Sequence, residues 1–250
     1  MYIERGGQGP DLLLLLHGMG ATAAVWSPLC AEADDRWHGR WLALDLPGHG
    51  RSDRLDSYAI GQIAATVARA ALPEIDPAGR LVVLGHSMGG VIALALATGW
   101  FGVAPQRVFG LGIKAAWSDD DLRRMDALGT QPARLFATEA EARERYLKVA
   151  GLAGLVDAGS PVVARGVVQD GDGWRLAMDP RGHAVGKPPL AQLMAVACCP
   201  VHLGRGGHDP MMTNEQLRAL DPEARDLGPH GHNLMVEAPD RVWDWVVNGP

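Results

Sequence analysis

The stretch LVVLGHSMGG, residues 81–90, decides the fold of this chain. It begins with an apolar, partly β-branched run that is typical of a buried strand, and it ends in the pattern Gly-x-Ser-x-Gly. A second apolar run, residues 91–97, follows and has the composition of a helix. A strand, a sharp turn and a helix in this order form a nucleophile elbow, which exposes a serine on a strained turn. The stretch therefore predicts that Ser87 is a nucleophile, the alternative being a glycine-rich turn without chemistry.

Length and composition narrow the class of protein. A chain of 250 residues suits one domain, or one domain with an insertion, and its 47% hydrophobic and 21% charged residues are ordinary for a soluble protein. The net charge of −6 argues against nucleic acid or an anionic membrane as a partner. Its apolar runs are too short to span a membrane, and the N-terminal residues lack the layout of a signal peptide.

The three cysteines are Cys30 and the adjacent pair Cys198 and Cys199. They form neither a disulfide framework nor a metal-binding spacing. We therefore expect a cytoplasmic protein without a metal site or a cofactor. The sequence does not fix the oligomeric state.

Apolar runs alternate with helical segments along most of the chain. The predicted strands are residues 12–16, 41–44, 81–84, 107–113, 200–204 and 224–227, and the predicted helices are residues 21–33, 58–72, 91–97, 213–220 and 239–247. Such alternation implies parallel strands joined by right-handed crossovers. A continuous aliphatic run such as residues 12–16 predicts a strand that is buried on both faces.

The segment between the fourth and fifth predicted strands differs in character. Ser118 with Asp121 and Thr138 with Glu141 have the spacing of capping boxes, and each pair begins a charged helical segment. We therefore expect a helical cap inserted into an α/β core. The predicted core comprises residues 1–115 and 196–250, and the predicted cap comprises residues 116–195.

Residues suited to catalysis follow several predicted strands. Binding sites in open parallel sheets form outside the carboxyl ends of the strands. Ser87, Asp209 and His232 follow such ends, in the chain order serine, acid, histidine, which is one of the known orders of a catalytic triad. Two alternatives stay open at this point. His230 competes with His232 as the base, and Asp119 or Asp120 could replace Asp209 as the acid.

Five short segments carry a resemblance to a known family. They are HGMG at residues 17–20, DLPGHGRSD at 45–53, GHSMGG at 85–90, HDP at 208–210 and GHN at 231–233. Together they resemble the α/β-hydrolase superfamily over nearly the whole chain except the predicted cap. The resemblance implies a mostly parallel, doubly wound sheet with an inserted helical cap. The N-terminus is short for this family, which implies that one or two edge strands are missing.

The resemblance also implies a branch and a set of roles. The segments look like those of small carboxylesterases, lactonases, cofactor-free haloperoxidases and C–C bond hydrolases, whereas a serine at the elbow disfavours epoxide hydrolases and haloalkane dehalogenases, which carry aspartate there. A serine hydroxyl needs a neighbouring imidazole to remove its proton, a role that falls to His232 with Asp209 orienting it. The backbone N–H groups of Met19 and Met88 match the family's oxyanion hole.

Our first hypothesis is therefore a serine hydrolase that cleaves a small carboxylic ester or lactone through an acyl-enzyme. Apolar or sulfur-bearing side chains that we expect around its substrate are Trp26, Trp117, Phe136, Met211 and Met212. One alternative is a C–C bond hydrolase of a dienoate-type diketone, whose substrate carboxylate needs an arginine. The predicted cap offers Arg123, Arg124, Arg134, Arg143, Arg145 and Arg165. Another alternative is a ligand-binding receptor that keeps the fold and the triad.

Overall fold

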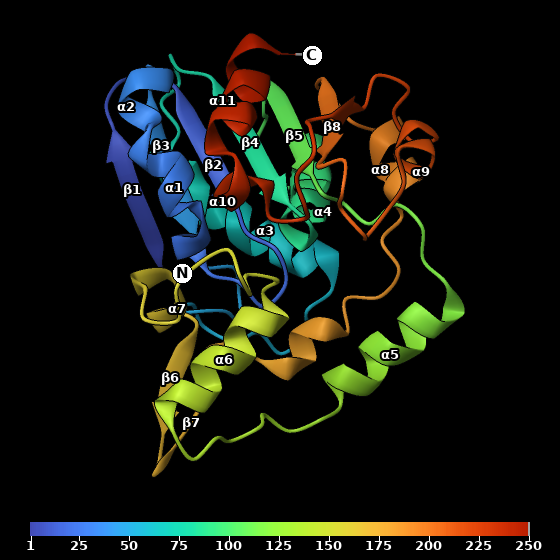
Figure 1. Cartoon of the computed structure of the whole chain (residues 1–250). Helices are drawn as coiled ribbons and strands as arrows, with labels where there is room; N and C mark the ends of the chain where they lie inside the picture. The colour runs from blue at the N-terminus through green and yellow to red at the C-terminus, as the bar shows by residue number, and fades with distance from the viewer. Residues whose placement is uncertain (250) are drawn as a thin grey trace.

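Within residues 1–249, which the computed structural model describes, seven strands form one sheet (Figure 1). Their spatial order is β1 (Ile3–Gly7), β3 (Arg40–Leu44), β2 (Leu12–Leu16), β4 (Leu81–His86), β5 (Arg107–Leu111), β8 (Val201–Arg205) and β9 (Arg225–Asp226). All neighbouring strands pair in parallel except β1, which is antiparallel to β3. The sheet confirms the predicted α/β class with a mostly parallel arrangement.

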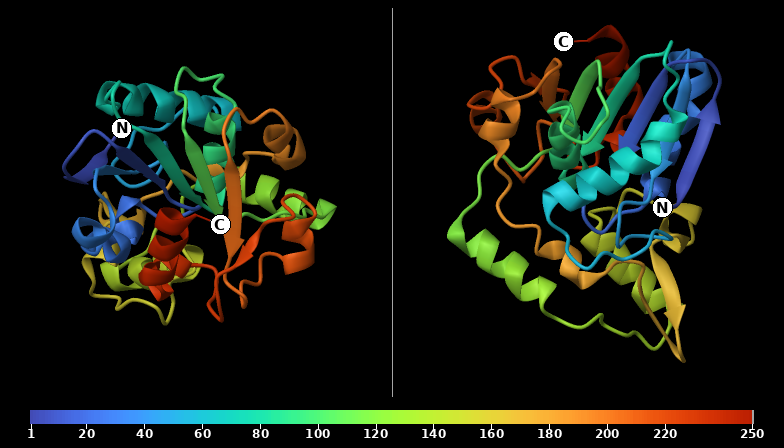
Figure 2. Two further views of the ribbon diagram at one scale, coloured as in Figure 1. Left: turned by 90° about the horizontal axis from the view of Figure 1, so that it is seen from above. Right: turned by 180° about the vertical axis from the view of Figure 1, so that it is seen from behind.

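Helices cover both faces of this sheet (Figure 2). One face carries α3 (Ile60–Ala71), which continues into the 3-10 turn η2 (Leu72–Glu74), together with α4 (Met88–Ala97), α8 (Leu190–Ala195) and α9 (Asn214–Arg218). The other face carries the 3-10 turn η1 (Ala23–Trp26), α1 (Ser27–Ala31), α2 (Ala33–Arg36), α10 (Leu234–Glu237) and α11 (Pro239–Asn248).

Strand β2 shows why two cores form. All five of its leucines are buried, and successive side chains of a strand point to opposite faces. Leu12, Leu14 and Leu16 accordingly belong to one apolar cluster. Leu13 and Leu15 belong to the other. The continuous aliphatic run thus fixes β2 at the centre of a sheet that is covered on both sides.

Several elements of the core differ from the sequence prediction: the short elements α2, η2 and α10 are not among those predicted, and two larger differences concern β1 and the first helix. Strand β1 was not predicted, because it is a half-buried edge strand with charged residues and two glycines. Gly6 is needed there, since a Cβ on it would lie 2.6 Å from the indole ring of Trp41. The helix expected at residues 21–33 is broken into η1 and α1, with Pro28 in the first turn of α1, where a proline is tolerated but cannot continue a preceding helix.

The segment between β5 and β8 lies at the end of the sheet where the parallel strands terminate (Figure 1). It contains α5 (Asp119–Gly129), α6 (Glu139–Val149), α7 (Pro161–Ala164), the hairpin β6 (Val167–Asp170) and β7 (Gly173–Leu176), and the turn η3 (Pro180–His183), followed by α8. Both expected capping boxes are formed, at Ser118 and at Thr138. The hairpin was not predicted. Helix α8 falls within the residues assigned to the cap, yet it packs in the same apolar cluster as α4.

Backbone contacts fasten this segment to the loop after β3. His49 forms a β-bridge with Met178, and Asp179 N donates to Gly48 O at 2.7 Å. The carboxylate of Asp179 also accepts from Tyr58 Oη at 2.9 Å. These contacts fix the segment between β5 and β8 to the loop after β3. No helix in the described part of the chain is long and apolar enough to cross a bilayer.

Candidate active site

Ser87 lies on a strained turn between β4 and α4. Its φ of +51° and ψ of −115° make it the one residue other than glycine with a positive φ among residues 1–249. Such a conformation is costly for a side chain and concentrates at functional sites. The turn fits only because its neighbours are glycines. A Cβ on Gly85 would collide with Gly89 O, and one on Gly89 would collide with Leu16 O.

Asp209 and His232 form a hydrogen-bonded pair. His232 Nδ1 lies 2.9 Å from Asp209 Oδ2, and the Asp209 side chain is fully buried. The other carboxylate oxygen accepts from Met211 N at 2.8 Å. A carboxylate only accepts hydrogen bonds, so His232 Nδ1 carries the proton and Nε2 is left as the acceptor. This is the tautomer that can take a proton from a hydroxyl.

His86, the residue before Ser87, contacts His232 of this pair. The His86 and His232 rings have centroids 4.5 Å apart, and His86 Nε2 donates to His232 O at 2.9 Å. Burial first, and the neighbouring His232 second, hold the pKa of His86 well below its usual value, so His86 is uncharged. Gly112, after β5, leaves room for the His232 ring, because a Cβ on this residue would lie 3.2 Å from the ring. His86 thus ties the loop of His232 to the residue that precedes Ser87.

The loop after β2 lies against the same turn. A Cβ on Gly18 would be 3.1 Å from Ser87 Cβ, so this glycine allows the close approach. His17 is fully buried and bridges the loop to its neighbour, because its Nε2 accepts from Leu46 N at 2.9 Å while Nδ1 donates to Gly18 O at 2.8 Å. Burial lowers the pKa of His17 to about 4. The His17 ring also packs edge-on against His49, at 5.1 Å between centroids.

Two backbone N–H groups are suited to bind an oxyanion. Met88 is the first residue of α4, and the first N–H groups of a helix have no partner within it. Met19 follows Gly18 in the loop that touches Ser87. The side chains of both methionines line the cavity in front of the serine.

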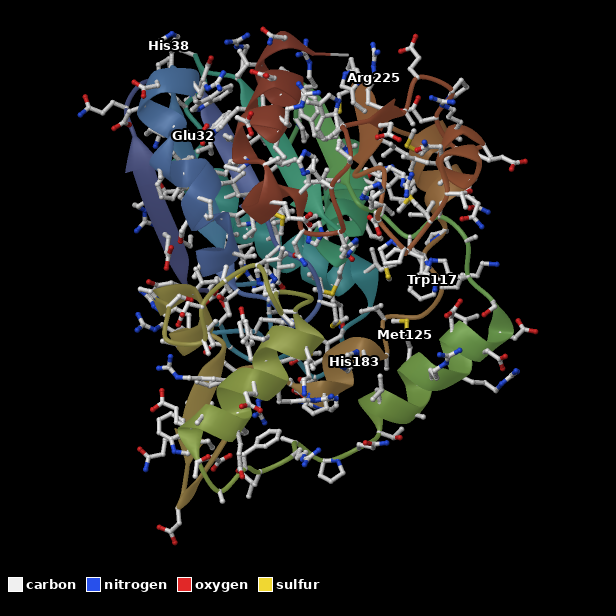
Figure 3. All side chains as sticks on the ribbon, viewed as in Figure 1. Glu32, His38, Trp117, Met125, His183 and Arg225 are labelled. Carbon is white, nitrogen blue, oxygen red and sulfur yellow. The ribbon has the colours of Figure 1, made fainter. Side chains whose placement is uncertain are left out.

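That cavity has a volume of about 270 Å³. Ser87 is one of its lining residues, and its walls are largely apolar. Trp117 and Met211 are among its lining residues. Figure 3 shows Trp117, Met125 and His183 between α5 and the core. The lining residues that were not predicted are Ile60, Val91, Ile92, Lys114, Asp121, Met125, His183, Val185 and Pro188.

Three expected lining residues lie elsewhere. Trp26 is fully buried in the apolar cluster on the α1 side of the sheet. Phe136 is held at the β6–β7 hairpin, where its backbone N donates to Trp174 O at 2.7 Å. Met212 is buried in the α4-side cluster and lines an adjacent open groove rather than the cavity of Ser87. All three side chains are apolar, and each packs against other parts of the fold instead of lining the cavity of Ser87.

The spacing of residues on α5 indicates part of the cavity lining that was not predicted. Asp121, Arg124 and Met125 lie three and four positions apart, so they share one face of the helix, and all three line the cavity. This face of α5 carries polar and charged residues, so apolar character alone does not indicate that it lines the cavity.

The alternative acids and base are not brought to this site. Asp119 and Asp120 lie on the exposed first turn of α5, and Asp120 pairs with Arg123. His230 contacts its surroundings through backbone bonds to Gly228 and His208, whereas the ring of His232 faces Asp209. In the described part of the chain, no group of three His, Cys, Asp or Glu side chains could hold a metal ion.

Comparisons with known proteins place the chain among hydrolases. The profile of the alpha/beta hydrolase family matches residues 13–245. The chain is 31% identical over 263 residues to the dihydrolipoyllysine-residue acetyltransferase component of the acetoin cleaving system of Pseudomonas putida, covering 96% of this chain and 64% of the relative. It is 37% identical over 172 residues to the pimeloyl-[acyl-carrier protein] methyl ester esterase of Vibrio parahaemolyticus, covering 68% and 61%. The chain thus spans less than two thirds of the length of both relatives.

Solved structures show the same fold at low sequence identity. The thioesterase domain from the curacin biosynthetic pathway superposes with a TM-score of 0.79 at 20% identity, covering 98% of this chain and 94% of that one. E-2-(acetamidomethylene)succinate hydrolase gives a TM-score of 0.79 at 21% identity, covering 98% and 93%.

Proposed function

The chain belongs to the alpha/beta hydrolase family, and we propose on this basis that it is a serine hydrolase of a small carboxylic ester or lactone. One observation carries the proposal: Ser87, on its strained turn, lines an apolar cavity and directly follows His86, whose ring packs against His232 of the Asp209–His232 pair. The esterases among the relatives support an ester as the substrate.

The proposed reaction uses an acyl-enzyme. His232 Nε2 takes the proton of Ser87 as Oγ attacks the carbonyl carbon, and Asp209 stabilises the imidazolium that forms. The negative charge on the former carbonyl oxygen is met by the N–H groups of Met19 and Met88, each such donor being worth about 3 kcal/mol. Collapse breaks the ester C–O bond, and His232 gives its proton to the departing alkoxide. Water then attacks the acyl-enzyme with the same proton transfers, which releases the acid and restores Ser87.

The cavity limits the size of the substrate. A volume of about 270 Å³ lies near the lower end of the range of small-molecule pockets, about 300–1,000 Å³. Apolar walls with a few polar groups suit a compact acyl group or a ring. We therefore propose small acyl or cyclic esters, and not long-chain lipids, as substrates.

The experiment that tests this proposal has two arms. A fluorophosphonate probe is expected to label Ser87 in the native protein and not in Ser87→Ala. A p-nitrophenyl ester series from acetate to palmitate, with lactones alongside, is expected to give its highest kcat/KM at the short end. Absence of label on Ser87 would overturn the nucleophile, and a maximum at palmitate would overturn the small cavity.

One observation favours a second candidate, C–C bond hydrolysis. Of the arginines in the predicted cap, Arg124 lines the cavity that holds Ser87. Lys114 lines it too, but it pairs with Asp121 at 2.9 Å. Arg124 could therefore bind the carboxylate of a dienoate substrate. Fast cleavage of a dienoate with negligible ester hydrolysis would favour this candidate over the first.

A further inference from the structure

The residue after His232 links the site to the end of α6. Asn233 is 1% exposed, and its Nδ2 donates to Ala150 O at 3.2 Å and to Gly151 O at 2.9 Å. These carbonyls follow the last residue of α6, Val149, where a helix leaves its C=O groups without partners. Asn233 therefore caps the C-terminus of α6 from a loop that is 82 residues away in the sequence.

The same helix end touches the loop of Met19. A Cβ on Gly20 would lie 2.7 Å from Val149 Cγ1, so the loop after β2 rests on this side chain. The C-terminal turn of α6 is thus in contact with two loops, one that carries the base and one that carries an oxyanion N–H. This arrangement fixes the two loops relative to each other through a third element.

The helix end is itself anchored. Tyr146 is 1% exposed, and it lies with Ala150 and Leu152 in the apolar cluster that contains Leu234 and Met235 of α10. A buried cluster of this kind is closely packed and does not shift freely. The end of α6 can therefore act as a fixed support.

We propose that Asn233 is a positioning residue that holds the loop of His232 at the end of α6 and so sets the imidazole relative to Ser87 and Met19. The proposal rests on the proposed function, because it assigns His232 a catalytic role. Only the donor side of the amide is used: among residues 1–249, the buried Asn233 Oδ1 has no hydrogen-bond partner. Asn233 thus acts through its two N–H groups, and a side chain of the same size without donors should not replace it.

Two variants of Asn233 separate the donors from the volume. Asn233→Ala removes both, whereas Asn233→Asp keeps the size but sets an acceptor-only carboxylate against two carbonyl oxygens. We expect both to lower kcat about 10- to 100-fold with little change in KM, because a misplaced catalytic group slows chemistry more than binding. The rate at which the fluorophosphonate labels Ser87 should fall in parallel, since labelling also depends on His232.

A matched control weakens the same helix from its other end. Thr138 Oγ1 accepts from the N–H of Glu141 and so caps the N-terminus of α6, the end opposite to Asn233. Thr138→Ala is expected to lower stability while kcat and the labelling rate stay at the wild-type value. A loss of kcat in Thr138→Ala equal to that in Asn233→Ala would show that helix stability alone explains the effect, and this would overturn the proposal.

A third variant approaches from the helix side. A Cβ on Gly151 would lie 2.8 Å from Asn233 Nδ2, and Gly151 has a φ of +69°, so Gly151→Ala is expected to displace the amide and to strain the end of α6, which lowers kcat with no substitution in the loop of His232. Its effect should not add to that of Asn233→Ala, because both break one contact. Folded Asn233→Ala with more than about half of the wild-type kcat would overturn the positioning role. Wild-type protein that neither labels nor cleaves any ester would instead overturn the proposed function itself.

Discussion

Helices α5 and α6 are both eleven residues long, both begin with a capping box, and both are rich in charge. They differ in what lies beneath them. Helix α6 buries Ala142 and Tyr146 in an apolar cluster of the core, whereas the one buried residue of α5 is Gly129. Helix α5 faces the cavity with Asp121, Arg124 and Met125 instead.

Because of this difference, we expect substitutions in the two helices to change different properties of the protein. The end of α6 contacts the loops of Met19 and of His232, so we expect a substitution there to change the rate of the chemical step. Helix α5 forms a wall that a substrate would touch, so a change there should reach binding and substrate preference. Similar sequence signals at their N-termini give no hint of this division, because it arises from the tertiary packing of their other faces.

The sharpest contrast is expected between two histidines of one loop. His232→Ala should lower kcat by about 10⁴-fold or more, because the members of a triad act as a unit. His230→Ala should keep most activity, since the ring that faces Asp209 is that of His232. Steady-state kinetics of both variants on one short ester check this. The opposite ranking would move the base to position 230.

The next contrast sets the acid of the core against the acids of α5. Asp209→Asn should lower kcat by roughly 10⁴-fold, because an amide at this position favours the wrong tautomer of His232. Asp119→Asn and Asp120→Asn should leave kcat nearly unchanged, as both carboxylates lie on the exposed first turn of α5. Should either of them prove worse than Asp209→Asn, the acid belongs to α5.

Substitutions in α5 and α6 should also differ in their effect on the free energy of unfolding. Tyr146→Ala on α6 removes a side chain that is 1% exposed, and such a deletion typically costs about 3–5 kcal/mol of unfolding free energy. Met125→Ala on α5 should change this free energy by about 0.5 kcal/mol or less while it alters KM and the preferred ester. Urea unfolding and the p-nitrophenyl series measure the two effects. Equal destabilisation by both variants would contradict the contrast.

The smallest effect is expected at the caps. Loss of a Ser or Thr cap costs about 1 kcal/mol, which is worth roughly 2–4 °C in Tm for a chain of this size. Thr138→Ala should show this shift, because α6 unfolds with the core. Ser118→Ala should leave Tm unchanged and speed amide hydrogen exchange along α5, because a thinly packed helix opens by itself. A fall in Tm for Ser118→Ala would show that α5 also unfolds with the core.

Local chemistry explains which features the sequence could predict. The turn at Ser87 needs glycines at fixed positions, and the two capping boxes need a hydroxyl three residues before a carboxylate, so both appear in short windows. The five leucines of β2 mark a strand that is buried on both faces. The fold class followed from these elements, because their order along the chain restricts the topology. The extent of the cap and the catalytic roles of Ser87, Asp209 and His232 stay predictions.

Features that depend on distant partners could not be predicted. Strand β1 pairs with β3 and places Gly6 against the indole of Trp41, and nothing in the sequence around Gly6 indicates this contact. The cavity lining also depends on distant partners. Trp26 was expected to line the cavity and does not, whereas Met125 lines it and was not expected. The indole of Trp26 was assigned to the site by its apolar character alone, but the packing of η1 buries it on the opposite side of the sheet from α4.

The three buried histidines under the site, His17, His49 and His86, make the fold sensitive to acid. Burial lowers the pKa of His17 to about 4 and that of His49 to about 3, from an ordinary value of 6.5, and it holds the pKa of His86 far below that value. Below pH 6.5 the unfolded chain therefore binds protons that the folded chain refuses, and stability falls as the pH falls toward the folded pKa values. Each histidine contributes to this loss in the pH range between its ordinary pKa and its folded pKa. Protons thus act as a ligand of the unfolded state.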